Sequence, residues 1–193
     1  MNIDPAGLEK AKPQEEDHTA PVEEFDLLEA LQVTEEEKAQ LPQDLILDPQ
    51  KQFTPQERDI LSQSLLKMTL PQKIRLALVG NQEARNLLIH DPNKVVALAV
   101  LRNPKIGEDE IVMYAQLRSL AEDVFSAMAK NKIWIKNYHI KLALVSNPKA
   151  PLSLSIKLLD HLHDRDLRNI SRSKNVSYIL ARTAARLLFK RGG

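Results

Sequence analysis

An apolar segment that ends in a polar residue recurs four times in the second two-thirds of the chain, as "KIRLALVGN", "KVVALAVLRN", "DVFSAMAKN" and "HIKLALVSN". We call the last residue of each segment its anchor: Asn81, Asn103, Asn131 and Asn147. Counting back from each anchor, positions three and seven are large and apolar, and position four is always alanine. These positions share one face of an α-helix, and alanine there lets a second helix approach closely. The pattern predicts helices that stack on one another.

A fifth, degenerate copy is "DLRNISRS", whose anchor is Ser173. Ile170 keeps position three apolar, but Asn169 and Asp166 occupy positions four and seven. A polar face of this kind is typical of the terminal unit of a repeat protein. The five anchors are separated by 16 to 28 residues. Stacked units tolerate such irregular spacing because each unit contacts only its neighbours.

The chain divides into three parts on composition. Residues 1–21 hold three prolines and many carboxylates but few large apolar side chains, so we expect them to be disordered. Residues 22–53 contain an acidic amphipathic segment, "VEEFDLLEALQV", followed by a connector from Leu41 to Phe53. The amphipathic segment is interpreted either as a docking helix for the protein's own groove or a partner, or as a local packing element. Residues 54–193 form the predicted helical repeat domain.

The repeat domain opens with a marked helix, "TPQERDILSQSLLKM". Thr54 is a good N-cap, Pro55 suits the first helical position, and Glu57 completes a capping box. An apolar stripe is expected from four side chains of this helix: Ile60, Leu61, Leu65 and Met68. We expect this helix to open the stack.

The segments "LAVLRNPKIGEDEIVMYA" and "LALVSNPKAPLSLSIKLL" resemble the leucine-rich-repeat-variant and HEAT-like families, over residues 71 to about 189. In those families an apolar helix ends in Asn-Pro and a second helix follows. The resemblance implies an all-α fold, an irregular right-handed α-solenoid of HEAT-like repeats, preceded here by the acidic arm. Members of these families mostly bind proteins, and a HEAT-like branch of DNA glycosylases cradles DNA.

Composition narrows the class of protein. Hydrophobic residues make up 43% of the 193 residues, enough for a core, and cysteine is absent. The N-terminus has no apolar stretch typical of a signal peptide, and no run approaches the roughly 20 apolar residues of a membrane helix. We therefore expect a soluble, cytoplasmic protein with no membrane partner.

Charge is distributed unevenly along the chain. Residues 1–70 carry 16 acidic and 6 basic side chains, whereas residues 71–193 carry 10 acidic and 21 basic ones. The acidic part is interpreted either as a simple tail on a basic domain, or as an arm that folds back on a basic surface or competes for it.

The sequence offers little that indicates catalysis. Cysteine is absent, and the five glycines form no phosphate-binding or dinucleotide-binding pattern. The cluster "DHLHDRD" is interpreted as a polar helix terminus rather than a metal site. Carboxylates near the basic segments have structural interpretations at helix starts: Asp91, Glu108, Asp109 and Glu110. No catalytic residue, metal or cofactor is predicted.

Basic residues recur around the anchors. Arg102, Lys130 and Arg172 precede their anchors directly, and Lys105 and Lys149 follow theirs by two residues. Because equivalent positions in a stack align along one edge, a basic ridge is expected there. The segment "KNKIWIKNYHIK" adds further members, Lys132, Trp134 and Lys136. Trp134 is interpreted either as a ring that stacks on bases or as a plug beneath a short unit.

These observations favour a non-enzymatic interaction module that binds a protein partner through a helical-repeat surface. The alternative is a nucleic-acid-binding protein of HEAT-like type whose acidic arm competes for the basic surface. A DNA-repair enzyme of the HEAT-like type is the least favoured interpretation.

Overall fold

The structure is a computed structural model that describes residues 33–47 and 53–192. The regular structure of these residues is entirely helical, without a strand, which confirms the predicted all-α class. Residues 1–21 and the predicted amphipathic segment up to Gln32 lie outside the described residues. The helices are α2 (Glu35–Ala39), η2 (Gln43–Leu45), α3 (Pro55–Leu66), α4 (Leu70–Val79), α5 (Gln82–Leu88), α6 (Lys94–Val100), α7 (Glu108–Gln116), α8 (Glu122–Lys130), η3 (Trp134–Lys136), α9 (Tyr138–Ser146), α10 (Leu152–Leu159), α11 (Asp164–Arg172) and α12 (Tyr178–Gly192).

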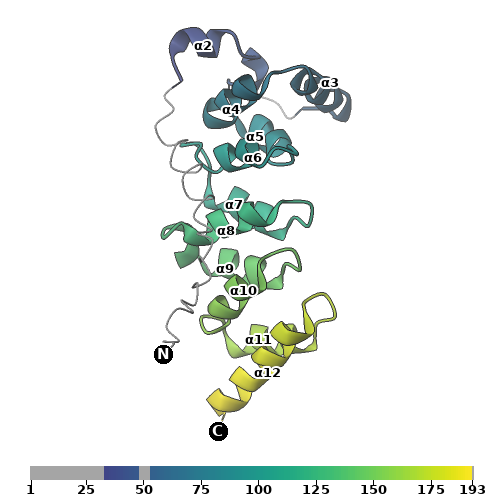
Figure 1. Cartoon of the computed structure of the whole chain (residues 1–193), viewed down its shortest axis with the longest axis vertical. Coiled ribbons are helices and arrows are strands. Elements are labelled where there is room, and N and C mark those ends of the chain that lie inside the picture. The colour runs from purple at the N-terminus through teal and green to yellow at the C-terminus, as the bar shows by residue number, and fades with distance from the viewer. Residues whose placement is uncertain (1–32, 48–52, 193) are drawn as a thin grey trace, which may run out of the picture.

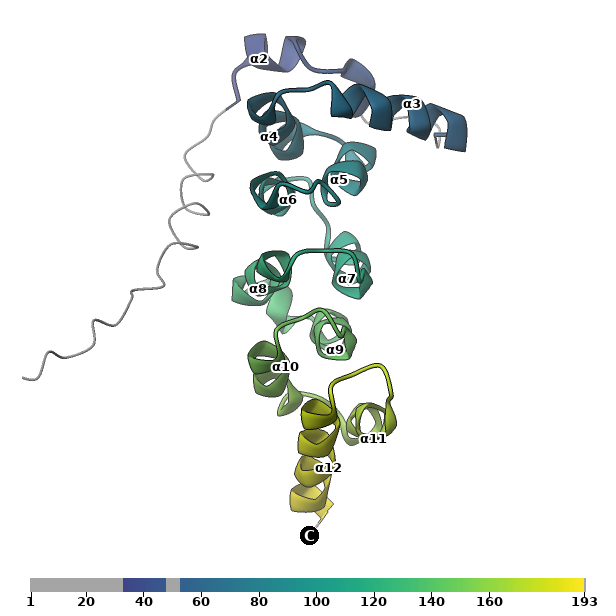
Figure 2. The same ribbon diagram turned by 45° about the vertical axis from the view of Figure 1, so that its right-hand side comes forward.

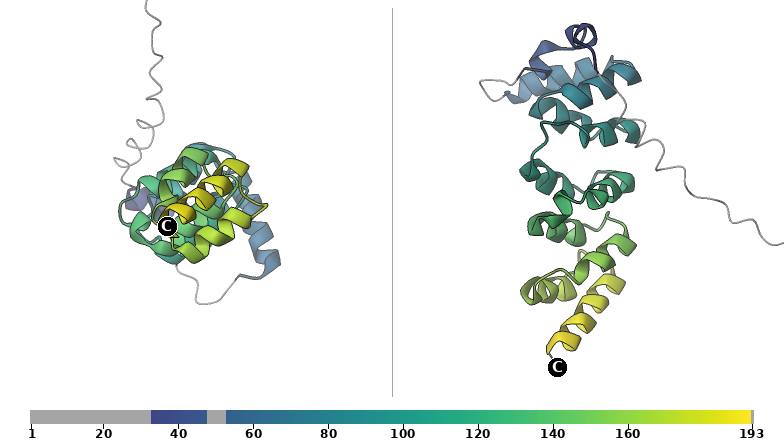
Figure 3. Two further views of the ribbon diagram at one scale, coloured as in Figure 1. Left: turned by 90° about the horizontal axis from the view of Figure 1, so that it is seen from below. Right: turned by 90° about the vertical axis from the view of Figure 1, so that its left-hand side faces the viewer.

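From α4 onward the helices stack in two layers along the long axis of the molecule (Figures 1 and 2). One layer contains α4, α6, α8, α10 and α12, and the other contains α5, α7, α9 and α11. The tertiary contacts agree, because α4 packs on α6, α6 on α8, α7 on α9 and α10 on α12. Viewed along the stack, successive levels lie over one another (Figure 3). Each helix therefore contacts mainly its neighbours in the stack.

From α4 to α11, consecutive helices run in opposite directions. Lys73, in the first turn of α4, pairs with Asp91, which follows the end of α5, at 2.8 Å. The start of α4 therefore lies beside the end of α5. His90 after α5 lies 3.2 Å from Ser119 after α7. The helices α5 and α7, which share a layer, therefore end at the same edge of the stack and run in the same direction.

Local signals in the sequence set the first helix boundaries. Thr54 caps α3, its side chain accepts a hydrogen bond from the Glu57 N–H, and the Glu57 carboxylate accepts one from the Thr54 N–H. The predicted capping box is confirmed. The predicted apolar stripe is only partly correct, because Leu65 is buried while Ile60 is 66% exposed.

The apolar face of the recurring segment is its packing face. The residue at position three is buried in all five copies. Four copies have an apolar residue at position seven; three of these residues are buried, and the fourth, Ile74, is half-buried. The four alanines at position four are buried as well. The side chains that face inward are thus those expected from the helical spacing.

Three anchors bind the end of one helix to an earlier part of the chain. Asn103 is buried after α6, and its Nδ2 donates to the carbonyl oxygens of Ala77 and Gly80, at 2.9 and 3.0 Å. Its Oδ1 accepts from the Lys105 N–H at 2.9 Å. Because Ala77 and Gly80 lie at the end of α4, the side chain joins two helices of the same layer.

Asn147 repeats this arrangement after α9. Its Nδ2 donates to the carbonyls of Ala115 and Leu117 at the end of α7, at 2.8 and 2.7 Å, and its Oδ1 accepts from the Lys149 N–H. Each buried amide thereby satisfies carbonyl groups that a helix end leaves without a partner.

The side chain of Asn81 donates hydrogen bonds to the connector that precedes α3, instead of to the end of another α-helix. Its Nδ2 donates to the carbonyls of Asp44 and Leu47, at 2.8 and 2.6 Å. Leu41 and Leu45 from this connector are buried in the core. Residues 41–47 therefore cover the first level of the stack.

Asn131 differs from the other asparagine anchors because it is only half-buried. Its Oδ1 accepts from the N–H groups of Ile133 and Trp134, within its own turn. The connection that follows contains only η3. After this short connection α9 packs on α7, and Asn137 at its start donates to Glu108 at the start of α7, at 2.6 Å.

The recurring segments consequently lie in both layers. The first three copies form α4, α6 and α8 in one layer, whereas the last two form α9 and α11 in the other (Figure 2). The short connection between Asn131 and Asn137 produces this change, since it supplies no second helix for the third copy.

We expect Asn103→Ala to lower the free energy of unfolding by about 1–3 kcal/mol, because two buried carbonyls lose their donor. Asn131→Ala is the matched control and should cost clearly less, since that side chain is half-buried and bonds only within its own turn. Urea unfolding followed by circular dichroism measures both values. Equal losses in the two variants would contradict the role assigned to the buried amides.

Candidate functional site

The predicted basic ridge is divided between two edges of the stack. Arg102 and Lys105 flank the end of α6, and Lys130 closes α8. Lys149 follows the end of α9. This helix runs parallel to α7 and antiparallel to α8 and α10 in the other layer. Arg172 closes α11, whose start lies beside the start of α9 through the hydrogen bond between Tyr138 and Asp166.

The ends of α6 and α8 therefore lie at one edge, and the ends of α9 and α11 lie at the opposite edge. Six of the eight predicted residues share the first edge: Arg102, Lys105, Lys130, Lys132, Trp134 and Lys136. Lys149 and Arg172 lie at the second edge. The structure does not bring the eight residues together, because the short connection after Asn131 changes the layer of the copies that follow.

Trp134 is half-buried in η3 and packs against the hydrophobic core, as does the neighbouring Ile135. The turn containing η3 contacts both α8 and α9. This position agrees with the interpretation of Trp134 as a plug beneath the short unit. The lysines around it, Lys130, Lys132 and Lys136, are exposed.

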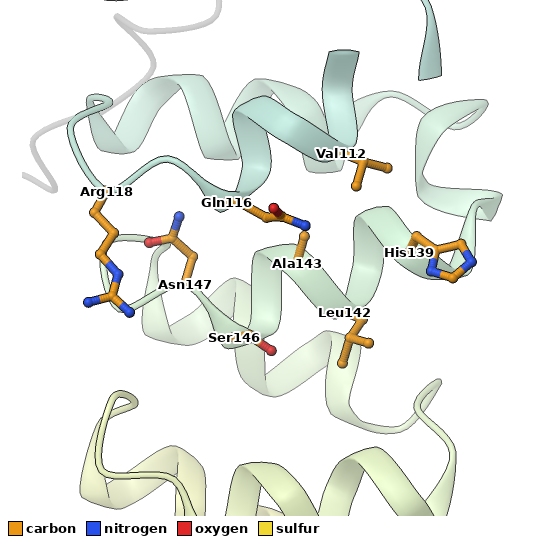
Figure 4. Close-up of a pocket in the computed structure, with 8 residues that line it drawn as sticks. All are labelled: Val112, Gln116, Arg118, His139, Leu142, Ala143, Ser146 and Asn147. Carbon is orange, nitrogen blue, oxygen red and sulfur yellow. The ribbon is translucent and has the colours of Figure 1, made fainter. Parts of the chain in front are cut away.

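A groove of about 370 Å³ lies between α7 and α9 (Figure 4). Val112 of α7 and Leu142 and Ala143 of α9 give it an apolar floor. Polar side chains surround this floor, with Arg118 near one end and His139 near the other (Figure 4). The groove is thus an apolar strip with an arginine near one end and a histidine near the other.

The polar side chains at the groove are available to a ligand. Within the described residues, the side chains of Gln116, Arg118 and Ser146 make no hydrogen bond or ion pair. Asn147 also lines the groove, but both of its Nδ2 donors are used in joining α9 to α7, and its Oδ1 accepts from the Lys149 N–H. Asn147 therefore shapes the groove, and the other three can donate to a bound molecule.

A buried polar network holds α7 against α5 beside this groove. Arg85 and Glu110 form a two-pronged ion pair, with N–O distances of 3.0 and 2.7 Å, and Arg85 also donates to the Gly80 carbonyl at 3.0 Å. The Tyr114 hydroxyl donates to Asn86 at 2.8 Å. Burial, with the adjacent Glu110 carboxylate, raises the pKa of the Tyr114 hydroxyl, which keeps it protonated as a donor.

Of the four carboxylates singled out near the basic segments, three have structural partners, and Asp109 lies exposed in the first turn of α7. Glu110 binds Arg85, Asp91 binds Lys73, and Glu108 accepts from Asn137. In "DHLHDRD", Asp164 pairs with Arg191 at 3.0 Å. Asp166 accepts from Tyr138, and burial together with this hydrogen bond raises the pKa of the Tyr138 hydroxyl.

Over residues 33–47 and 53–192, no group of three or more His, Cys, Asp or Glu side chains is placed to hold a metal ion. None of the helices in that part of the chain is long and apolar enough to cross a membrane.

The groove between α7 and α9 could not have been predicted from the recurring pattern alone. Ala143 occupies the position predicted to touch another helix, yet in α9 it borders open space. The residues His139, Leu142, Ala143 and Ser146 stand at positions i, i+3, i+4 and i+7 and so share one helical face. That spacing could have indicated a mixed apolar and polar strip, but not which helix lies opposite.

Comparison of the chain with models of protein families, with curated proteins and with solved structures finds no match.

We expect Ala99→Leu and Ala143→Leu to differ in their effect on stability. Ala99 is fully buried in α6, so three added carbons should destabilise the fold by about 1–3 kcal/mol through overpacking. Ala143 is 8% exposed and borders the groove, so leucine there should fill part of it with less than about 1 kcal/mol of change. Thermal and urea unfolding of both variants measure this. A large loss in Ala143→Leu would mean that the groove is closed in solution.

Proposed function

We propose that the chain is a non-enzymatic, cytoplasmic interaction module, a right-handed α-solenoid of HEAT-like repeats that binds a protein partner through its surface. Stacking in two layers supports this proposal, because it exposes a long surface relative to the volume of the core. Arrays built in this way commonly present extended binding surfaces.

The groove between α7 and α9 is the observation that carries the proposal. It combines an apolar floor with three polar side chains, Gln116, Arg118 and Ser146, that make no hydrogen bond or ion pair within the described residues. Sites that recognise protein segments have this composition, since apolar contacts supply affinity and a few polar groups set the orientation.

The chemistry of the groove indicates the kind of segment that would bind. Val112, Leu142 and Ala143 would receive one apolar side chain. Arg118 would pair with a carboxylate, and Gln116 and Ser146 would bond to backbone groups of the segment. A short segment with an apolar residue next to an acidic one fits these requirements.

We expect Arg118→Glu to abolish partner binding without lowering stability, because the guanidinium is exposed and makes no ion pair in the described structure. Full-length protein, Arg118→Glu and the control Lys67→Glu are used for affinity capture from nuclease-treated extract, followed by quantitative mass spectrometry. Lys67 is exposed at the end of α3, far from the groove along the stack (Figure 1). Proteins retained by the wild type and the control but lost with Arg118→Glu support the proposal.

An identical set of proteins on all three baits would show that the groove takes no part in binding. Proteins that are captured from untreated extract but not from nuclease-treated extract would show that nucleic acid is the direct ligand.

Nucleic-acid binding is the alternative, and one observation favours it: exposed Lys105, Lys130, Lys132 and Lys136 share one edge of the stack. If this edge binds a phosphate backbone and the acidic arm competes for it, deleting residues 1–32 should tighten binding and salt should weaken it steeply. Fluorescence anisotropy with labelled DNA and RNA measures both effects, and reversing the charges of Lys130, Lys132 and Lys136 should abolish binding. No binding at concentrations of about tens of micromolar would leave protein recognition as the function of the surface.

A further inference from the structure

A second groove, of about 390 Å³, lies at the C-terminal end of the stack between α10 and α12. Ile156 and Leu159 of α10 and Leu187 of α12 provide apolar walls. Arg186 and Lys190 line the α12 side, and Asp160 is the acidic residue in the lining. Within the described residues, the side chains of Arg186 and Lys190 make no hydrogen bond or ion pair.

The surroundings of this groove are strongly basic. From Asp164 to Gly192 the chain carries eight basic and two acidic side chains, a net charge of +6. Both acidic side chains are engaged, Asp164 with Arg191 and Asp166 with Tyr138. The cations of α11 and α12 are thus almost uncompensated by acidic groups of their own region.

The terminal helix also exposes large apolar side chains. On α12, Tyr178 is 74% exposed, Ile179 is 56% exposed and Phe189 is 85% exposed. A groove with apolar walls and a basic rim, on a helix that also exposes large apolar side chains, matches the mode in which an amphipathic helix lies in a groove. The basic rim requires that this helix be acidic.

Residues 22–32 of the same chain have this chemistry. The sequence "VEEFDLLEALQ" carries four acidic and no basic side chains. Phe25, Leu28 and Leu31 recur at helical spacing and would form the apolar face. These residues lie outside the described part of the chain, so the match rests on their sequence and on the chemistry of the groove.

The segment of the same molecule cannot reach this groove. Val33 adjoins α2, which packs on α4 at the end of the stack opposite α12 (Figure 1). Three helix-to-helix steps of about 8–10 Å separate α4 from α10, the nearer wall of the groove, at least about 24 Å in total. Leu28 is five residues from Val33 and so can lie at most about 18 Å from it. Only a second copy can supply the segment.

We propose that the groove between α10 and α12 binds residues 22–32 of a second copy of this chain. The apolar face of the segment lies against Ile156, Leu159 and Leu187, and its carboxylates pair with Arg186 and Lys190. The two surfaces in contact are different, so a dimer joined by one such contact keeps one unused groove and one unused segment. The chains therefore associate head to tail. This association uses a different surface from the groove between α7 and α9 and does not depend on the proposed function.

Sedimentation velocity of the full chain, from about 1 µM to roughly 300 µM, tests the proposal. We expect species larger than a dimer to grow with concentration, and the association to weaken at high salt because the contact pairs opposite charges. The groove variant Arg186→Glu/Lys190→Glu and the segment variant Leu28→Asp should each weaken self-association by at least about tenfold. The control Arg165→Glu/Arg168→Glu makes the same charge change on the exposed face of α11 and should associate like the wild type.

Mixing the two defective variants gives the sharpest result. The groove variant keeps an intact segment and the segment variant keeps an intact groove, so the mixture should form a 1:1 dimer and nothing larger. A wild type that stays monomeric, a groove variant that associates normally, or a mixture that stays monomeric would overturn the proposal. Association that disappears after nuclease treatment would overturn it as well, in favour of bridging by nucleic acid. Arg118→Glu should self-associate like the wild type, which separates this result from the outcome of the partner-binding experiment.

Discussion

The buried amide of an anchor asparagine is the interaction on which the stack depends. A helix end leaves carbonyl groups without partners, and burial makes such groups costly unless a donor reaches them. Asn103 and Asn147 supply that donor across two helices of one layer, while their oxygens accept from the next turn of their own chain. One side chain therefore ends a helix, begins the following turn and sets the position of the helix stacked beside it.

Much of the fold could be predicted because it depends on local patterns. The spacing of apolar residues identifies the buried faces, and the Thr54 capping box marks the start of α3. The sequence also shows that only a short connection follows Asn131. Its effect could not be predicted, since whether α9 packs on α8 or on α7 depends on contacts between residues far apart in the chain. The predicted ridge placed Lys149 and Arg172 with Lys130 because it assumed that every copy lies in the same layer.

The candidate sites were harder to predict than the fold, and alanine shows why. Ala99 and Ala143 occupy equivalent positions in the recurring segment, but only Ala99 is fully enclosed. An alanine permits close approach without requiring it, so the same residue can close a contact or leave room for a groove. The groove between α10 and α12 is equally dependent on context, because its walls come from two helices separated by α11.

The change of layer after Asn131 is a matter of parity. In a stack of helices with alternating direction, a motif returns to the same edge only when an odd number of helices lies between its copies. The connection from Asn131 to Asn137 contains no full helix, so every copy downstream is inverted relative to those upstream. Loss or gain of a single helix could in this way move a row of side chains to the opposite edge of such a protein without any substitution within the motif. Sequence similarity between copies would then hide a complete exchange of surfaces.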